Sequence, residues 1–205
     1  MHRRIVAVLL CCHSGCALES LEPEASLVTY WGTVEDSDAV IAITLTESAA
    51  VAYVCGGELT RETHTRWYSA ELSRPLIEGD SLVLGANNGQ QLELQLSADS
   101  LIGSYLDPDG TAFNFDAVVP SQGEFHGLYT VVDSGCRTGV IVNIDASNNS
   151  EVQGAWCNET GIFEQVTPIA PINPGASSFD ITVVSAAAGF EEKRLTVEMI
   201  DPISF

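Results

Sequence analysis

Three cysteines and a histidine crowd into residues 9–16, the stretch LLCCHSGC, and these residue types bind zinc in many proteins. Thiolate and imidazole ligands at Cys11, Cys12, His13 and Cys16 would suit a metal ion. Structural zinc sites usually use two separated ligand pairs on elements that fold around the ion, and this stretch supplies one cluster only. We therefore expect no metal site here, and the position of the stretch near the N-terminus indicates another role.

The N-terminus has the order of a secretory signal: positive residues, an apolar run, then small residues. Arg3 and Arg4 precede an apolar run over residues 5–12, which is far shorter than the roughly 20 residues of a membrane-spanning helix. Ser14, Gly15 and Cys16 follow. These three residues resemble the last three positions of the bacterial lipoprotein lipobox, although that family usually has Leu in the place of His13.

In that family the lipobox cysteine is lipidated and becomes the new N-terminus. The resemblance implies a signal peptide over residues 1–15, lipid attachment at Cys16 and an acidic tether over residues 16–27. Ala17 beside the anchor implies sorting to the outer membrane. The expected location is therefore the cell envelope, with the membrane as a partner through the N-terminal lipid. The alternative is a secreted or periplasmic soluble protein.

The chain is strongly acidic, with 8 Lys and Arg against 28 Asp and Glu and a net charge of −20. Nucleic-acid binding depends on positive charge that displaces phosphate counterions, so we expect no nucleic-acid partner. The acidity favours solubility, with cation binding as the alternative. Because 45% of the residues are hydrophobic, the chain has ample material for a buried core.

From residue 28 to residue 205 the sequence predicts one all-β domain. Short apolar runs alternate with turn residues, and Leu92, Leu94 and Leu96 alternate with polar residues as in a half-buried antiparallel strand. The stretches at 87–89 and 107–110 have the composition of hairpin turns. Expected strands cover residues 39–46, 50–55, 65–72, 81–86, 91–97, 101–106, 111–119, 127–132, 139–144, 152–157, 178–184 and 194–200. We expect an antiparallel hairpin meander that closes like a barrel, with a two-sheet β-sandwich as the alternative.

Two stretches about a hundred residues apart look alike. Residues 31–55 and 128–157 both contain Thr-Val-x-Asp-Ser and then Val-Ile, which matches residues 40–41 with 140–141. Both stretches end on a strand that closes with a cysteine, Cys55 or Cys157. The similarity suggests an internal duplication of a three-strand meander, which would divide the domain into halves over residues 28–120 and 121–205.

If lipidation uses Cys16, three cysteines remain in the exported body: Cys55, Cys136 and Cys157. Exported compartments permit disulfides. Cys136 begins one strand of an expected hairpin and Cys157 ends the other, so antiparallel pairing would bring them nearly opposite. We favour a Cys136–Cys157 disulfide, with Cys55–Cys157 and Cys55–Cys136 as alternatives. The remaining cysteine is expected to be a buried thiol.

The body has no recognisable catalytic set. His64 and His126 stand in no motif, and polar neighbours predict surface or turn positions for both. Trp67 and Tyr68 would point to opposite faces of a strand, so one of them should belong to the core rather than to a sugar-binding platform. Scarce cations in an acidic chain predict structural ion pairs for Arg66 and Arg137.

These observations favour a non-catalytic binding or structural module that is displayed on a lipid tether, with no cofactor and with an unknown protein or small-molecule ligand. The first alternative is a small-ligand carrier, which would need a deep cavity inside a barrel. The second is a secreted hydrolase, which would need a pocket where a histidine meets an acid and a nucleophile.

Overall fold

The computed structural model describes residues 27–133, 135–157, 163–173, 175–185 and 191–205. In this part of the chain the structure is almost entirely β, with one helix, α1 (Arg61–His64), and a final 3-10 turn, η1 (Pro202–Ser204). The first group of strands is β1 (Val28–Val34), β2 (Val40–Leu45), β3 (Ala49–Cys55), β4 (Arg66–Glu71), β5 (Ser81–Gly85), β6 (Gln91–Ser97), β7 (Ser100–Leu106) and β8 (Ala112–Val118). The second group is β9 (Phe125–Asp133), β10 (Cys136–Ile144), β11 (Ser150–Cys157), β12 (Phe163–Pro168), β13 (Ser178–Ser185) and β14 (Glu191–Met199).

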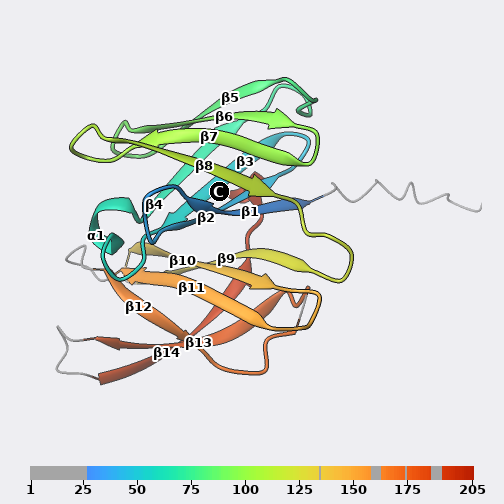
Figure 1. The fold of residues 1–205 in the computed structure, drawn as a ribbon. Helices are drawn as coiled ribbons and strands as arrows, with labels where there is room; N and C mark the ends of the chain where they lie inside the picture. Colours follow the sequence, from blue (N-terminus) through green and yellow to red (C-terminus); the bar gives the residue numbers. More distant parts are fainter. Residues whose placement is uncertain (1–26, 134, 158–162, 174, 186–190) are drawn as a thin grey trace, which may run out of the picture.

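Strands β1 to β8 form a closed antiparallel barrel, called barrel 1 here (Figure 1). Each strand pairs with its neighbour in the chain, and β1 closes the ring by pairing with β8. In β6 the three leucines of the alternating pattern point inward and the polar residues point outward. Side chains of this interior form one core cluster, which includes Ile41, Ile43, Tyr68, Leu92, Tyr105 and Phe115. An interior filled by side chains is typical of small eight-stranded barrels.

Strands β9 to β14 form a second closed antiparallel barrel of six strands, called barrel 2 here. It closes where β14 pairs with β9. Its interior has a separate core cluster, which includes Tyr129, Val140, Val142, Trp156, Ile181 and Val197. The two barrels lie one above the other in Figure 1, and the chain runs back from β14 to end against barrel 1, where η1 contacts β3. The expected barrel-like, all-β, antiparallel fold is confirmed.

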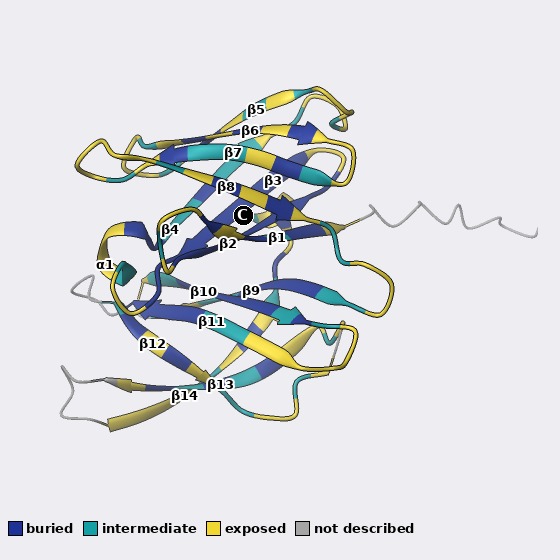
Figure 2. Ribbon diagram, in the orientation of Figure 1, coloured by how far each residue is buried: buried dark blue, intermediate teal, exposed yellow. Residues whose placement is uncertain are grey.

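Strands β2 and β3 are buried along their whole length, as the dark blue ribbon in Figure 2 shows. One face of these strands points into barrel 1, and the other packs against barrel 2. The second contact, called the junction here, has its own core cluster: Val40, Ala42, Val51, Tyr53, Cys55, Leu128, Ile141, Ala155 and Ile200. Burial on both faces explains why these strands read as unbroken apolar runs rather than alternating patterns.

Gly139 of β10 allows the two barrels to approach at the junction. A Cβ atom at Gly139 would lie 2.5 Å from two carbon atoms of the Tyr53 ring. That ring also packs against Trp67, with 4.4 Å between ring centroids. Because Tyr53 is buried in the junction cluster, any movement of its ring away from a new methyl group would disturb the junction.

Gly139→Ala is therefore expected to lower the free energy of unfolding by about 1–3 kcal/mol, because it overpacks a fixed aromatic contact. Denaturant unfolding of the purified variant measures this change. Gly85→Ala is the matched control, because a Cβ atom at Gly85 would meet nothing within 4 Å. Equal stabilities of the two variants would mean that the junction adapts freely around Tyr53.

The two similar stretches of sequence occupy equivalent places, since β1 to β3 and β9 to β11 are the first three strands of each barrel. Two closed antiparallel barrels of similar build are consistent with duplication. The strand registers correct the details of the match, however. The sequence match aligns Trp31 of β1 with Leu128 of β9. Trp31 pairs with Ala42, and Leu128 pairs with Ile141, so Ala42 corresponds to Ile141. The match of residues 40–41 with 140–141 is therefore displaced by one residue.

The same strand registers show that Cys55 and Cys157, the last residues of the two similar stretches, do not occupy equivalent positions. Val40 pairs with Cys55, whereas Gly139 pairs with Ala155. Cys55 therefore corresponds to Ala155 rather than to Cys157. The shared cysteine at the end of each stretch is a coincidence of sequence and does not reflect an equivalent position in the ladders.

Candidate functional site

A groove at the edge of the junction is the best candidate for a functional site. It has a volume of about 520 Å³, and residues of both barrels line it. Barrel 1 and its loops contribute Tyr53, Glu62, Thr65, Arg66, Trp67, Ala86, Asn87 and Asn88, and barrel 2 contributes Val132, Gly135, Cys136, Arg137 and Phe163. The groove therefore exists only because the two barrels pack together. It combines an aromatic floor with a few polar groups, as small-molecule sites commonly do.

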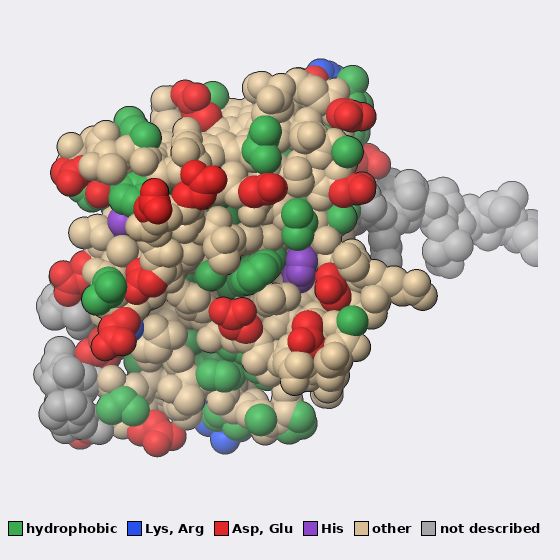
Figure 3. Space-filling model, viewed as in Figure 1, with side chains coloured by type: hydrophobic (Ala, Val, Ile, Leu, Met, Phe, Trp, Pro, Cys, Tyr) green, Lys and Arg blue, Asp and Glu red, His purple; other side chains and the backbone are tan. Residues whose placement is uncertain are grey.

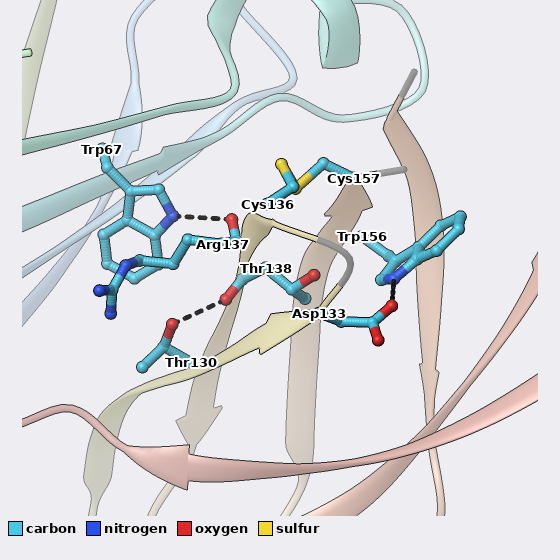
Figure 4. The surroundings of a disulfide bond; sticks show 8 residues. All are labelled: Trp67, Thr130, Asp133, Cys136, Arg137, Thr138, Trp156 and Cys157. Carbon is cyan, nitrogen blue, oxygen red and sulfur yellow. Dashed lines mark hydrogen bonds between the residues drawn. A yellow bond between two sulfur atoms is a disulfide. The ribbon is translucent and has the colours of Figure 1, made fainter. Parts of the chain in front are cut away.

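A disulfide lies at the edge of the groove, where Cys136 forms part of the wall (Figure 4). It joins Cys136 of β10 to Cys157 of β11, with 5.8 Å between their Cα atoms. The favoured pairing is confirmed. Cys55 is a buried free thiol in the junction, as expected for the remaining cysteine of the body. Burial raises the pKa of this thiol to about 12, which keeps it protonated and unreactive.

Trp67 connects the two barrels beneath the groove. Its indole Nε1–H donates a hydrogen bond to the backbone oxygen of Arg137, at 3.2 Å (Figure 4). Its ring packs between Tyr53 and Phe205, with centroids 4.4 and 5.2 Å away. Tyr68, the next residue, points into barrel 1 and is 1% exposed. The prediction that at least one of these two aromatic residues belongs to the core is confirmed.

Acidic side chains are spread over both barrels on the face shown in Figure 3. Three of the cations in the described part of the chain form ion pairs with such residues: Arg74 with Asp80, Lys193 with Asp133, and Arg194 with Asp180. Arg61 donates a hydrogen bond to Gln165 instead.

Arg66 and Arg137 form no ion pair with any described residue, so the predicted structural ion pairs are wrong for both. The Arg137 guanidinium lies over the Phe205 ring, 4.3 Å from its centroid, and burial lowers its pKa. The physical reason is the location of these residues: both line the groove, where aromatic and amide side chains are among the neighbours and where Glu62, the one carboxylate of the described lining, forms an ion pair with neither of them.

The predicted surface or turn positions of the two histidines are also wrong. His64 is 3% exposed and His126 is 7% exposed. His64 is the last residue of α1, and its ring packs on Phe113 with 4.4 Å between centroids. His126 of β9 packs against Trp31 at 5.9 Å. Polar neighbours in the sequence suggested exposure, but α1 covers one end of barrel 1 and β9 faces the junction.

Burial lowers the pKa of both histidines below the value of about 6.5 that they have in an unfolded chain. The unfolded chain therefore binds more protons as the pH falls through this range, and the folded state loses stability relative to it. We expect the free energy of unfolding to fall between about pH 7.5 and pH 5.5, above the range where most carboxylates titrate. Denaturant unfolding of the wild type and of His126→Gln measures the effect. An equally steep pH dependence in His126→Gln would contradict a contribution from His126.

Neither histidine lines the groove, so the described walls lack the histidine base that a serine hydrolase would use. Within the residues that the structure describes, no group of three or more His, Cys, Asp and Glu side chains could hold a metal ion. In the same residues, no helix has the length and apolar character needed to cross a membrane.

Some expected features lie outside the described residues. These are the signal peptide over residues 1–15, the lipid attachment at Cys16 and nearly all of the tether over residues 16–27. Conversely, sequence reasoning missed several groove residues, namely Glu62, Asn87, Asn88 and Phe163. They come from separate loops and strands, and no motif or spacing links them.

The chain matches no known protein-family model, no curated protein and no solved structure.

Proposed function

We propose that this chain is an exported, lipid-anchored envelope protein that acts as a non-catalytic binding module. Cys16 carries the lipid, and the acidic tether holds the two barrels away from the outer membrane. The groove at the junction is the binding site. Its ligand carries a carboxylate or a similar acidic group on a flat apolar body.

The N-terminal sequence supports the export and anchoring part of this proposal. The positive, apolar and small segments occur in the order of a signal, and Cys16 stands at the lipobox cysteine position. The Cys136–Cys157 disulfide agrees with export, because disulfides persist in oxidising compartments and are rare in the cytosol.

The two arginines without ion pairs carry the proposal for the groove. The protein has far more acidic than basic residues, so a surface cation should readily find a carboxylate partner. Arg66 and Arg137 instead line one cavity and have no carboxylate partner among the described residues. Guanidinium groups bind carboxylates through paired, charge-assisted hydrogen bonds. A ligand carboxylate would supply the partner that the protein does not provide.

The floor of the groove accounts for the apolar part of the proposed ligand. Tyr53, Trp67 and Phe163 contribute aromatic surface to the lining, and the exposed amides of Asn87 and Asn88 can orient a polar edge. Aromatic side chains pack well against flat apolar groups. Since the interiors of both barrels hold packed core clusters, the groove is a better ligand site than a barrel interior.

Benzoate is a suitable probe, because it joins a carboxylate to a flat ring, and benzamide is its neutral control. In an NMR titration, benzoate is expected to shift the signals of groove residues, including the Trp67 indole N–H. Benzamide should cause much smaller shifts at the same positions. Equal effects of the two compounds, or shifts spread over both barrels, would contradict an acid-binding groove.

Substitution of the groove arginines tests the same site by changing the protein instead of the ligand. Arg66→Gln and Arg137→Gln are each expected to weaken benzoate binding by about tenfold, because each removes a charge-assisted hydrogen bond. Arg74→Gln is the matched control, since Arg74 pairs with Asp80 and does not line the groove. Unchanged binding in both groove variants would rule out their role.

A further inference from the structure

Three buried polar side chains meet at the end of barrel 1 that α1 covers. His64, Tyr68 and Tyr105 are 3%, 1% and 2% exposed. In each of them one polar atom is buried and has no hydrogen-bond partner among the described residues: His64 Nε2, Tyr68 OH and Tyr105 OH. Burial of a single unpaired polar atom is unfavourable, so three of them in one place need a common explanation.

The three side chains share one neighbourhood. The Tyr105 ring lies 5.8 Å from the His64 ring and 6.4 Å from the Tyr68 ring, measured between centroids. Burial raises the pKa of Tyr68 to about 12 and also raises the pKa of Tyr105.

The hydrogen bonds of α1 favour one tautomer of His64, with the proton on Nδ1. The Thr63 hydroxyl lies 3.2 Å from the backbone oxygen of Thr60 and 2.9 Å from His64 Nδ1. When the Thr63 hydroxyl donates to the Thr60 carbonyl oxygen, which can only accept, its single proton is used there. The hydroxyl oxygen then accepts from Nδ1–H of His64. Because burial lowers the pKa of His64, the ring is neutral, and Nε2 is a bare acceptor that needs a donor.

We propose that a water molecule is bound inside this end of barrel 1, where it donates to His64 Nε2 and accepts from the phenol hydroxyls of Tyr68 and Tyr105. A water molecule has the right chemistry, because it donates and accepts at once. Buried waters typically make about three hydrogen bonds, and this site offers three protein atoms. With the His64 proton on Nδ1, an anion would not satisfy the set, since it cannot donate to Nε2.

The site lies directly behind one wall of the groove. His64 points into barrel 1, whereas Glu62 and Arg66 on either side of it line the groove. The bound water would therefore fix α1 against Tyr68 and Tyr105 and hold this wall in place. The inference does not depend on what the groove binds.

Two measurements on the full chain test the inference. The first is a high-resolution crystal structure, in which a density peak is expected within hydrogen-bond distance of His64 Nε2 and of a phenol oxygen. The second is the stability of Tyr105→Phe. If the hydroxyl binds the water, its loss should reduce the folding equilibrium constant about fivefold.

Tyr129→Phe calibrates the second measurement, because the Tyr129 hydroxyl is also at the inner side of a barrel strand and donates to the backbone oxygen of Ala176 at 2.9 Å. A density peak together with a loss in Tyr105→Phe comparable to that in Tyr129→Phe supports the bound water. Absence of the peak, or an unchanged or raised stability in Tyr105→Phe, overturns it, because removal of an unpaired buried hydroxyl is neutral or favourable.

Discussion

Cys16→Ser is expected to release the protein from the membrane fraction of the cells that make it. In the proposed maturation a diacylglycerol is attached to the Cys16 thiol, and the peptide before it is removed. Stable anchoring needs about two acyl chains, so loss of the attachment point should remove membrane binding altogether. A serine hydroxyl cannot replace the thiol as the acceptor. The expected change is all or none.

Intact-mass spectrometry and membrane fractionation measure this effect together. The wild type should carry a diacylglycerol-sized mass and sediment with membranes, whereas Cys16→Ser should do neither. Cys12→Ser is the matched control, because it removes a thiol from the same stretch and should leave the anchor intact. A soluble wild type that is cleaved at another position would refute lipidation at Cys16.

Cys136→Ser is expected to lower the free energy of unfolding by about 3 kcal/mol. The disulfide closes a loop with a sequence separation of 21 and fastens β10 to β11 beside the groove. Without it, the unfolded chain gains conformations, and the two strands can separate at that end. The position of Cys136 in the groove wall predicts that benzoate binding weakens as well.

Denaturant unfolding with and without a reductant measures the contribution of the disulfide. The reductant should bring the wild type to the stability of Cys136→Ser and leave the variant unchanged. The double variant Cys136→Ser, Cys157→Ser should lose no more than the single variant, since the bond is already absent. A wild type that is insensitive to reductant would contradict a stabilising bond.

The strands were largely predictable from the sequence because most of them have a simple relation to the core. In β6 every second residue is a buried leucine, which fixes both the strand and its inward face. Strand β12 was missed, because its sequence FEQVTP is short, ends in proline and has a buried Glu164 at a position where a polar residue suggests exposure. Helix α1 was missed because four residues are too few to show a helical period.

The arrangement of the barrels and the groove could not be predicted from local pattern. The unbroken apolar run of β2 is typical of a strand that is buried on both faces, but it does not indicate that barrel 2 covers the outer face. Arg66 and Arg137 both line the groove, and they approach each other only because the two barrels pack together. The disulfide was predictable, in contrast, because Cys136 and Cys157 lie on adjacent strands of one hairpin.

The most direct test of the binding site is a crystal of the protein soaked with para-bromobenzoate, because the anomalous signal of bromine locates the ligand without ambiguity. The proposed function predicts a bromine peak in the groove at the junction, with the carboxylate directed towards Arg66 or Arg137 and the ring against Trp67 or Phe163. The same soak of Arg66→Gln, Arg137→Gln crystals should show no such peak. A peak at Arg74 or at another exposed cation, with an empty groove in the wild type, would contradict the account.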